Sequence, residues 1–220
     1  MDKKSNPKVY FPYSYQEARL AILNQQSSIS YVENANYNNL CIESVIKPST
    51  YINMSEAVSL QKINIDSTLE RVAQWFLFKA SMSNKKLQKL CYYAYCWFFV
   101  FFNDVETITQ DNVGEIDVLC SDRFQAWIHG PVSLKLYHRY KDYGWHDIPR
   151  VETQPEISCE IITLLEQVWE AYGHFSADEL ERISHRETPW QNARRGYQPG
   201  DACSNEISDY DILQYYLNLG

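Results

Sequence analysis

The feature that most constrains this fold is an uncharged run, LCYYAYCWFFVFF, at residues 90–102. Its 13 residues are too few to cross a membrane, since a helical span needs about 20. In and before the run, apolar side chains recur at steps of three and four residues, the period of a helix: Leu87, Leu90, Ala94, Trp97 and Phe101. Aromatic residues favour a strand by propensity, but the helical period outweighs that preference. We therefore expect a helix that begins at Ser83 and is buried by the rest of the chain.

The size and composition are those of an ordinary globular protein. A chain of 220 residues can bury roughly 70% of its extended surface, so it needs neither metal nor disulfides for stability. Hydrophobic residues make up 45% and charged residues 22%, which argues against disorder. There are only 7 glycines, so glycine-rich phosphate loops are poorly supplied. Nucleotide-binding enzymes therefore become less probable.

Capping residues, prolines and glycines mark the other helices. In chain order we expect helices that begin at Ser67, at Gly130-Pro131 (ending at Gly144), at Ile161 (ending at Tyr172-Gly173), at Ser176, at Pro189 and at Ser208. Pro189 must either end the preceding helix or restart it. Residues 103–123 are polar with a short apolar alternation, which indicates a loop or a small hairpin. The predicted fold is mainly α, a single helical domain with this insertion.

The first 66 residues differ from the rest of the chain. Ser14-Tyr15-Gln16-Glu17 has the form of a capping box and predicts one short helix, after which asparagine, serine and tyrosine dominate. We interpret residues 1–66 as an N-terminal extension packed on a main domain at residues 67–220. A partly mobile linker is the alternative.

Charge is distributed unevenly along the chain. The formal net charge is −8, and residues 151–220 carry 13 acidic but only 4 basic side chains. An acidic surface repels phosphate and suits a basic protein partner, so we expect no nucleic-acid partner. The acidic helices can equally serve to keep the protein in solution. An autorepressor that binds DNA is the least favoured class, because no helix-turn-helix pattern with a basic recognition helix is visible.

Metal and cofactor sites find little support. The six cysteines include no C-x-x-C pair and the five histidines no H-E-x-x-H motif, so we expect no metal and no cofactor. The N-terminus lacks the apolar core of a secretory signal, and we expect free thiols, no membrane association and a cytoplasmic location. His185 and Glu187 offer an acid/base pair, although residues near Pro189-Trp190 more often brace helix ends.

The densest segment is FQAWIHGPVSLKLYHRYKDYGW, residues 124–145. Stiff aromatic rings near lysine and arginine are typical of a binding hot spot. We expect four of its residues in the core, Trp127, Val132, Leu136 and Tyr140. The polar-tipped His129, Lys135, His138 and Arg139 are expected on the surface.

Three segments in this order resemble the signature blocks of the Panacea domain, the SocA-like antitoxin family that includes phage-associated GepA-type proteins. They are KKLQKLCYYAYCW at 85–97, the segment 124–145, and SHRETPWQNAR at 184–194. The similarity spans roughly residues 67–198. It implies a mostly helical fold and a role in toxin–antitoxin modules, in which the domain neutralises a small toxin by direct contact. In the SocA case it implies an adaptor that hands the toxin to an intracellular protease.

From the resemblance and the hot-spot segment together we expect a non-enzymatic antitoxin whose partner is a cognate protein toxin. The predicted partner-binding residues are Lys89, Tyr93, Trp127, His129, Lys135, Tyr137, His138 and Arg139. Residues 1–66 are the candidate for partner selectivity. Two alternatives stay open: a proteolytic adaptor that delivers the toxin to a protease, and an uncharacterised enzyme that uses His185, Glu187 and His129 on the partner. No catalytic residue is assigned.

Overall fold

A computed structural model describes residues 65–103, 108–110 and 116–219, and within these residues the fold is mainly helical. The described part contains seven α-helices: α2 (Ile65–Lys79), α3 (Asn84–Phe102), α4 (Leu134–Tyr140), α5 (Cys159–Tyr172), α6 (Ala177–Ser184), α7 (Thr188–Ala193) and α8 (Asp209–Leu217). It also has two antiparallel two-stranded sheets, β1 (Met82–Ser83) with β4 (Asp147–Ile148), and β2 (Phe124–Trp127) with β3 (Gly130–Ser133). The short helix predicted at Ser14 lies outside the described residues.

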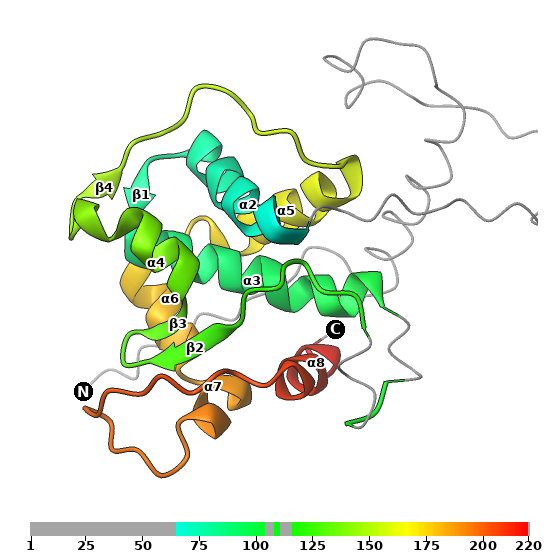
Figure 1. Cartoon of the computed structure of the whole chain (residues 1–220), viewed down its shortest axis with the longest axis vertical. Helices are drawn as coiled ribbons and strands as arrows, with labels where there is room; N and C mark the ends of the chain where they lie inside the picture. The colour runs from blue at the N-terminus through cyan, green and yellow to red at the C-terminus, as the bar shows by residue number, and fades with distance from the viewer. Residues whose placement is uncertain (1–64, 104–107, 111–115, 220) are drawn as a thin grey trace, which may run out of the picture.

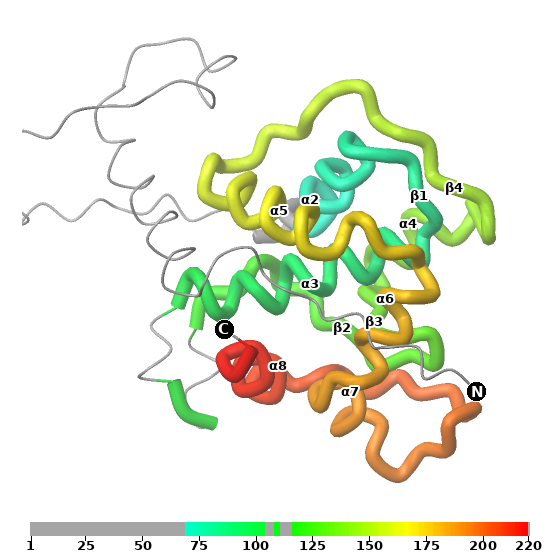
Figure 2. Tube along the Cα trace, turned by 180° about the vertical axis from the view of Figure 1, so that it is seen from behind, coloured from blue at the N-terminus to red at the C-terminus, as the bar shows by residue number. Residues whose placement is uncertain are grey.

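Helix α3 is the centre of the domain. Every residue from Leu87 to Phe101 is buried, so the helix is covered on all sides, as its apolar sequence requires. In both views of the chain α3 runs between the pair α2 and α5 on one side and α7 and α8 on the other (Figures 1 and 2). The strands β2 and β3 and the helices α4 and α6 cover its N-terminal half. The prediction of a buried helix from Ser83 is confirmed.

Stacked rings connect α3 to the helices around it. Tyr93 stacks on Tyr172 of α5, with 3.9 Å between ring centroids. Trp97 meets Tyr216 of α8 edge-on at 5.1 Å, and its indole N–H donates to the hydroxyl of Tyr172 at 3.1 Å. The aromatic residues that favour a strand by propensity thus serve as large contact surfaces of a helix.

Most of the predicted helix starts are confirmed. The side chains of Ser83 and Ser208 accept hydrogen bonds from the backbone N–H of Lys86 and Asp211. Ser176 forms a complete capping box with Glu179. Pro189 lies in the first turn of α7, so it restarts the helix after the break that follows α6.

Three starts are corrected. Helix α2 begins at Ile65, two residues before the predicted capping box, and α5 begins at Cys159, two residues before the predicted Ile161. Gly130 and Pro131 lie in strand β3, and the helix begins only at Leu134, capped by the Ser133 side chain. The reason is that Gly130, at φ +92°, closes a two-residue turn after β2, which pairs Pro131 with Ala126.

The hairpin is therefore β2–β3, which lies after the predicted insertion. In the described part of residues 103–123 there is no strand. Asn103 holds this loop with two bonds to one backbone position: its side-chain oxygen accepts from the N–H of Asp117 at 2.8 Å, and its amide donates to the carbonyl of Asp117 at 3.0 Å.

A C-terminal segment continues the hairpin on its outer edge. The N–H of Ile207 donates to the carbonyl of Phe124 at 2.8 Å, and the N–H of Ala126 donates to the carbonyl of Asn205 at 2.8 Å. Gln125 and Glu206 form an isolated antiparallel bridge. Strand β2 thus has neighbours on both sides.

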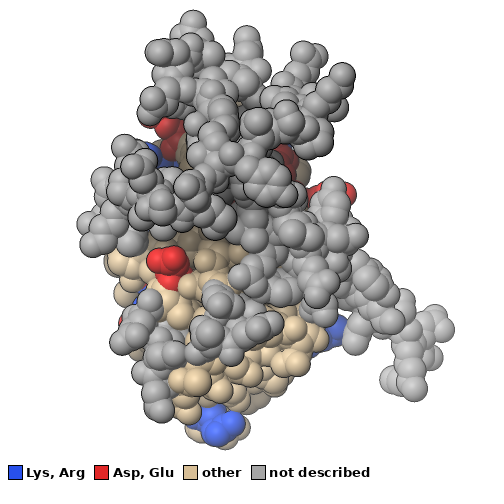
Figure 3. Space-filling view, turned by 90° about the vertical axis from the view of Figure 1, so that its right-hand side faces the viewer, with Lys and Arg blue, Asp and Glu red and all other residues tan. Residues whose placement is uncertain are grey.

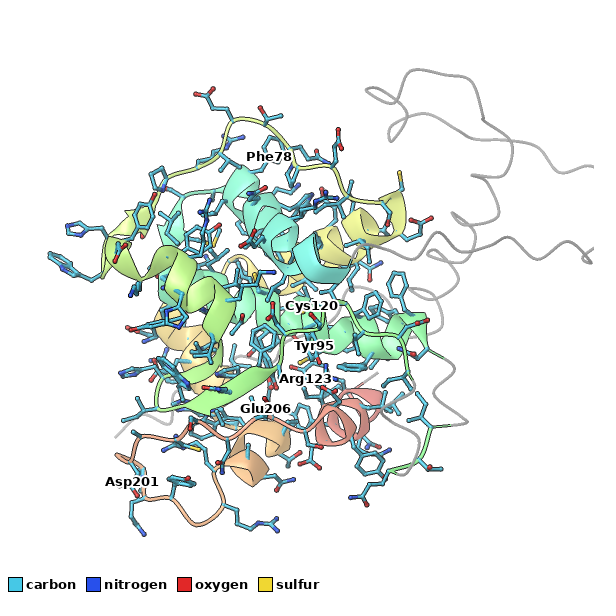
Figure 4. All side chains as sticks on the ribbon, viewed as in Figure 1. Phe78, Tyr95, Cys120, Arg123, Asp201 and Glu206 are labelled. Carbon is cyan, nitrogen blue, oxygen red and sulfur yellow. The ribbon has the colours of Figure 1, made fainter. Side chains whose placement is uncertain are left out.

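A polar brace joins α3, the approach to β2, and α8. Figure 4 shows Tyr95 and Arg123 next to each other near the start of β2. The guanidinium of Arg123 donates to the hydroxyl of Tyr95 at 2.7 Å and lies 3.1 Å from the carboxylate of Asp209. The Tyr95 hydroxyl in turn donates to Asp209 at 2.7 Å. Burial raises the pKa of Asp209, so its charge depends on these partners.

Replacing Arg123 with alanine tests this brace. We expect the free energy of unfolding to fall by about 1–3 kcal/mol, because a mostly buried carboxylate loses its cation. Urea unfolding followed by tryptophan fluorescence measures the change. The control is Arg186→Ala, which removes an exposed arginine and is expected to have a much smaller effect. Equal effects of the two changes would contradict the brace.

Candidate functional site

Strand β3 is completed by two side chains of α3. Gln88 bonds both backbone groups of Ser133: its amide donates to the carbonyl at 3.2 Å, and its oxygen accepts from the N–H at 2.9 Å. The ammonium of Lys89 donates to the carbonyl of Pro131 at 2.9 Å. The first and second sequence blocks are thereby joined through the free edge of a strand, whose buried backbone groups need partners.

The third block holds the other strand of the hairpin. The guanidinium of Arg194 donates to the carbonyls of Ala126 at 2.8 Å and Asp201 at 2.7 Å. The indole of Trp190 donates to the carbonyl of Trp127 at 3.1 Å. Arg194 also lies over the Trp190 ring, at 5.1 Å from its centroid. All three blocks therefore meet at the hairpin, and many of their polar residues hold it in place.

The buried charged residues of these blocks are Lys89, Glu187 and Arg194, and burial shifts the pKa of the first two. Lys89 is 1% exposed, and burial lowers its pKa to about 7. Glu187, the N-cap of α7, accepts a hydrogen bond from the hydroxyl of Tyr216 at 3.0 Å, and burial raises its pKa to about 8. Near neutral pH both groups therefore titrate inside the domain.

A side-chain contact joins the turn of the hairpin to α6. His129 Nδ1 lies 3.2 Å from Glu181 Oε1. Glu181 also pairs with Lys85, whose ammonium bonds Asp178 at 2.7 Å. These contacts fix the direction in which the exposed turn points.

The acid/base pair suggested by the sequence is not assembled. His185 stacks on the Trp190 ring with 4.0 Å between centroids, and burial lowers its pKa. Glu187 is turned inward to Tyr216, while His129 faces Glu181. The three residues of the enzymatic alternative thus have separate partners. Among the described residues no group of three metal-ligating side chains is present, and no helix is long and apolar enough to cross a membrane.

The structure divides the predicted partner-binding residues into two groups. Lys89 and Tyr93 are buried in α3, which corrects their expected place on a contact surface. The polar ends of both side chains are directed into the interior because β3 and α5 cover this part of the helix.

The other six predicted residues belong to the hairpin and α4, and none of them is fully buried. His129, His138 and Arg139 are exposed, whereas Trp127, Lys135 and Tyr137 are half-buried. The rings of Trp127 and Tyr137 are 4.9 Å apart and connect the hairpin to α4. Of the expected core residues, Val132, Leu136 and Tyr140 are buried, but Trp127 is not fully covered.

Sequence reasoning did not single out two apolar members of this surface, Ile128 (37% exposed) and Leu134 (40% exposed). The sequence feature that could have indicated their exposure is their position: Ile128 lies in the hairpin turn and Leu134 is the first residue of α4. We call the whole set the hairpin–α4 face: Trp127, Ile128, His129, Leu134, Lys135, Tyr137, His138 and Arg139. It lies at the left edge of the domain in Figure 1.

Comparison with known protein families gives one match. Residues 87–191 match the family described as Antitoxin SocA-like, Panacea domain. The match includes most of α3, the hairpin, α4, α5, α6 and part of α7. None of the curated proteins or solved structures compared with the chain matches it.

Replacing Gly130 with alanine tests the contact between Lys89 and the hairpin. An added Cβ would lie 2.6 Å from Cε of Lys89 and 2.8 Å from Oγ of Ser184. We expect a loss of about 1–3 kcal/mol from overpacking, in addition to backbone strain. Gly196→Ala is the matched control, since Gly196 has φ +94° but no atom within 4 Å of the added Cβ. Chemical denaturation should give a clearly larger loss for Gly130→Ala, and equal losses would refute the close contact.

The buried carboxyl predicts a pH dependence of stability. The folded-state pKa of Glu187, about 8, lies above its ordinary value of 4.5. The cost of burying Glu187 is therefore absent below pH 4.5 and grows as the pH rises to 8. Glu187→Gln, which can still accept from Tyr216, should gain stability over the wild type across this range by about 1 kcal/mol or more. Thermal unfolding from pH 4.5 to 8 measures the difference. The control is Glu170→Gln at an exposed position, whose melting temperature should change with pH as that of the wild type does. If the melting temperature of Glu187→Gln also follows the wild type at every pH, the cost of burying Glu187 is refuted.

Proposed function

Because residues 87–191 belong to the SocA-like Panacea antitoxin family, we propose that this chain neutralises a cognate protein toxin by binding it directly. The observation that carries the proposal is the hairpin–α4 face, where exposed apolar, aromatic and cationic side chains lie together inside the matched segment. Side chains of this mixture dominate the binding energy of protein interfaces.

The hydrogen bonds beneath the hairpin support a role of the hairpin–α4 face in binding a partner. Gln88, Lys89 and Arg194 fix the backbone of both hairpin strands, and His129 is held against Glu181. A surface whose backbone is already fixed loses less conformational entropy when a partner docks. Lys89 and Tyr93 would then contribute to binding by supporting the face from beneath.

The setting we propose is the cytoplasm. Four buried cysteines among the described residues have free thiols: Cys91, Cys96, Cys120 and Cys203. Burial raises the pKa of the Cys91 and Cys96 thiols far above its usual range, so they stay protonated and unreactive. Residues 1–66 remain the candidate for partner selectivity.

Co-expression with the product of the adjacent reading frame tests the function. The neighbouring product alone should stop growth, and the wild-type chain should restore it. Arg139→Glu should weaken binding by about tenfold or more, about 1.4 kcal/mol, with little change in melting temperature, because Arg139 is exposed. Lys135→Glu should act in the same direction. Arg195→Glu, an exposed arginine outside the face, is the control and should protect like the wild type.

Toxin abundance separates the two modes of neutralisation. A constant level of toxin during restored growth indicates direct inhibition, whereas its disappearance indicates delivery to a protease. If the neighbouring product is harmless, or growth stays arrested in the presence of the wild-type chain, the antitoxin assignment is wrong.

A further inference from the structure

Helix α8 is attached to the rest of the domain by a small set of contacts. Its buried side chains are Ile212, Leu213 and Tyr216. Its ion pair is that of Asp209 with Arg123, and the described surface visible from the C-terminal end of α3 is mostly uncharged (Figure 3). A helix with few buried side chains separates from its neighbours more readily than one that is covered on all sides, as α3 is.

A buried carboxyl group lies between α8 and α3. The hydroxyl of Tyr216 on α8 donates to Glu187 at 3.0 Å. From α3, Tyr92 and Tyr93 face the same carboxyl. Burial raises the pKa of Glu187, and these three hydroxyls oppose the increase only in part. Within the described residues Glu187 has no cationic partner, so its ionised form would have no counter-ion at this place.

The other titratable groups that face Glu187 keep their protons near neutral pH. They come from three helices: Tyr92, Tyr93 and Cys96 of α3, Tyr172 of α5, and Tyr215 and Tyr216 of α8. Burial raises the pKa of each of them above its ordinary value. The pKa values of Lys89 and His185 depend instead on burial and on Glu181 of α6. Glu187 is therefore the group in this cluster whose charge changes near neutral pH.

Proton binding at Glu187 is linked to any opening that exposes it. Between its ordinary pKa of 4.5 and its folded-state pKa of about 8, the carboxyl is protonated in the closed domain and ionised once water reaches it. Such an opening releases one proton to the solvent, so its equilibrium constant rises about tenfold for each pH unit in this range. Separation of α8 from α3 removes Tyr216 from the carboxyl and is therefore an opening of this kind.

We propose that the protonation of Glu187 controls a local opening in which α8 detaches from α3 while the other described helices stay folded. The protonated carboxyl keeps α8 attached, and loss of the proton to the solvent accompanies detachment. Helix α8 is consequently held less firmly at neutral than at acidic pH. This opening is a property of the chain alone, so it is independent of the proposed antitoxin function and is tested without a partner.

Hydrogen exchange of the full-length chain, followed by mass spectrometry at several pH values between 4.5 and 8, tests the proposal. Division by the intrinsic exchange rate at each pH gives the opening constant of each peptide. Peptides of α8 should open at least about tenfold more often than peptides of α3. In the wild type the opening constant of α8 should rise about tenfold for each pH unit, and in Glu187→Gln this dependence should disappear.

A second carboxyl of the same attachment provides the matched control. Asp209 also fixes α8, through Tyr95 and Arg123, and burial raises its pKa. Asp209→Asn should increase the opening constant of α8 at every pH, because the attachment is weakened, but should retain the dependence on pH near neutrality. Glu170→Gln at an exposed position of α5 should behave like the wild type.

Three results would overturn the local opening. One is an equal opening constant for α8 and α3, which would mean that α8 opens only when the whole domain unfolds. Another is an opening constant of α8 that does not change with pH. Both are measured on the wild type, so they remain decisive if a variant fails to fold. The third is a pH dependence that persists in Glu187→Gln or disappears in Asp209→Asn, which would assign the proton to another group.

Discussion

The constraint that governs this domain is the apolar circumference of α3. A helix that is apolar all round must be shielded from water on every side, and no single neighbour can do this. Helices from both halves of the domain, together with the β2–β3 hairpin, therefore pack around one rod (Figure 1). Within the described residues, the side chains that remain exposed are those on the outer surfaces of the covering elements.

A strand that covers α3 buries backbone N–H and C=O groups, and side chains of α3 itself supply the hydrogen-bond partners. The inner edge of β3 carries backbone groups that water cannot reach, and Gln88 and Lys89 bond them directly. A buried lysine is costly, yet its tip is the group that reaches the carbonyl of Pro131. Gly130 is needed at the same place because any side chain there would meet the lysine. The family blocks are thus largely a set of mutually dependent packing residues.

Local signals were sufficient for most helix starts, because a cap such as Ser83 or Ser176 acts within four residues. The helix start predicted at Gly130-Pro131 was wrong because the same dipeptide suits both a helix start and a turn followed by a strand. Only the distant partners on α3 decide between the two. Lys89 and Tyr93 looked like surface residues for a similar reason: their polar ends bond or stack with groups far away in the sequence. Trp145 is 84% exposed because no helix or strand among the described residues covers it, and no local pattern indicates this.

Both edges of the hairpin are occupied, one by Gln88 and Lys89 and the other by residues 205–207. A binding partner therefore cannot extend the β2–β3 sheet with a strand of its own, so main-chain pairing at the hairpin is closed as a route of recognition. Any contact that another molecule makes with the hairpin has to use side chains, and these can change by surface substitution without altering the backbone. The same closure protects a chain rich in tyrosine and phenylalanine against edge-to-edge aggregation through the hairpin.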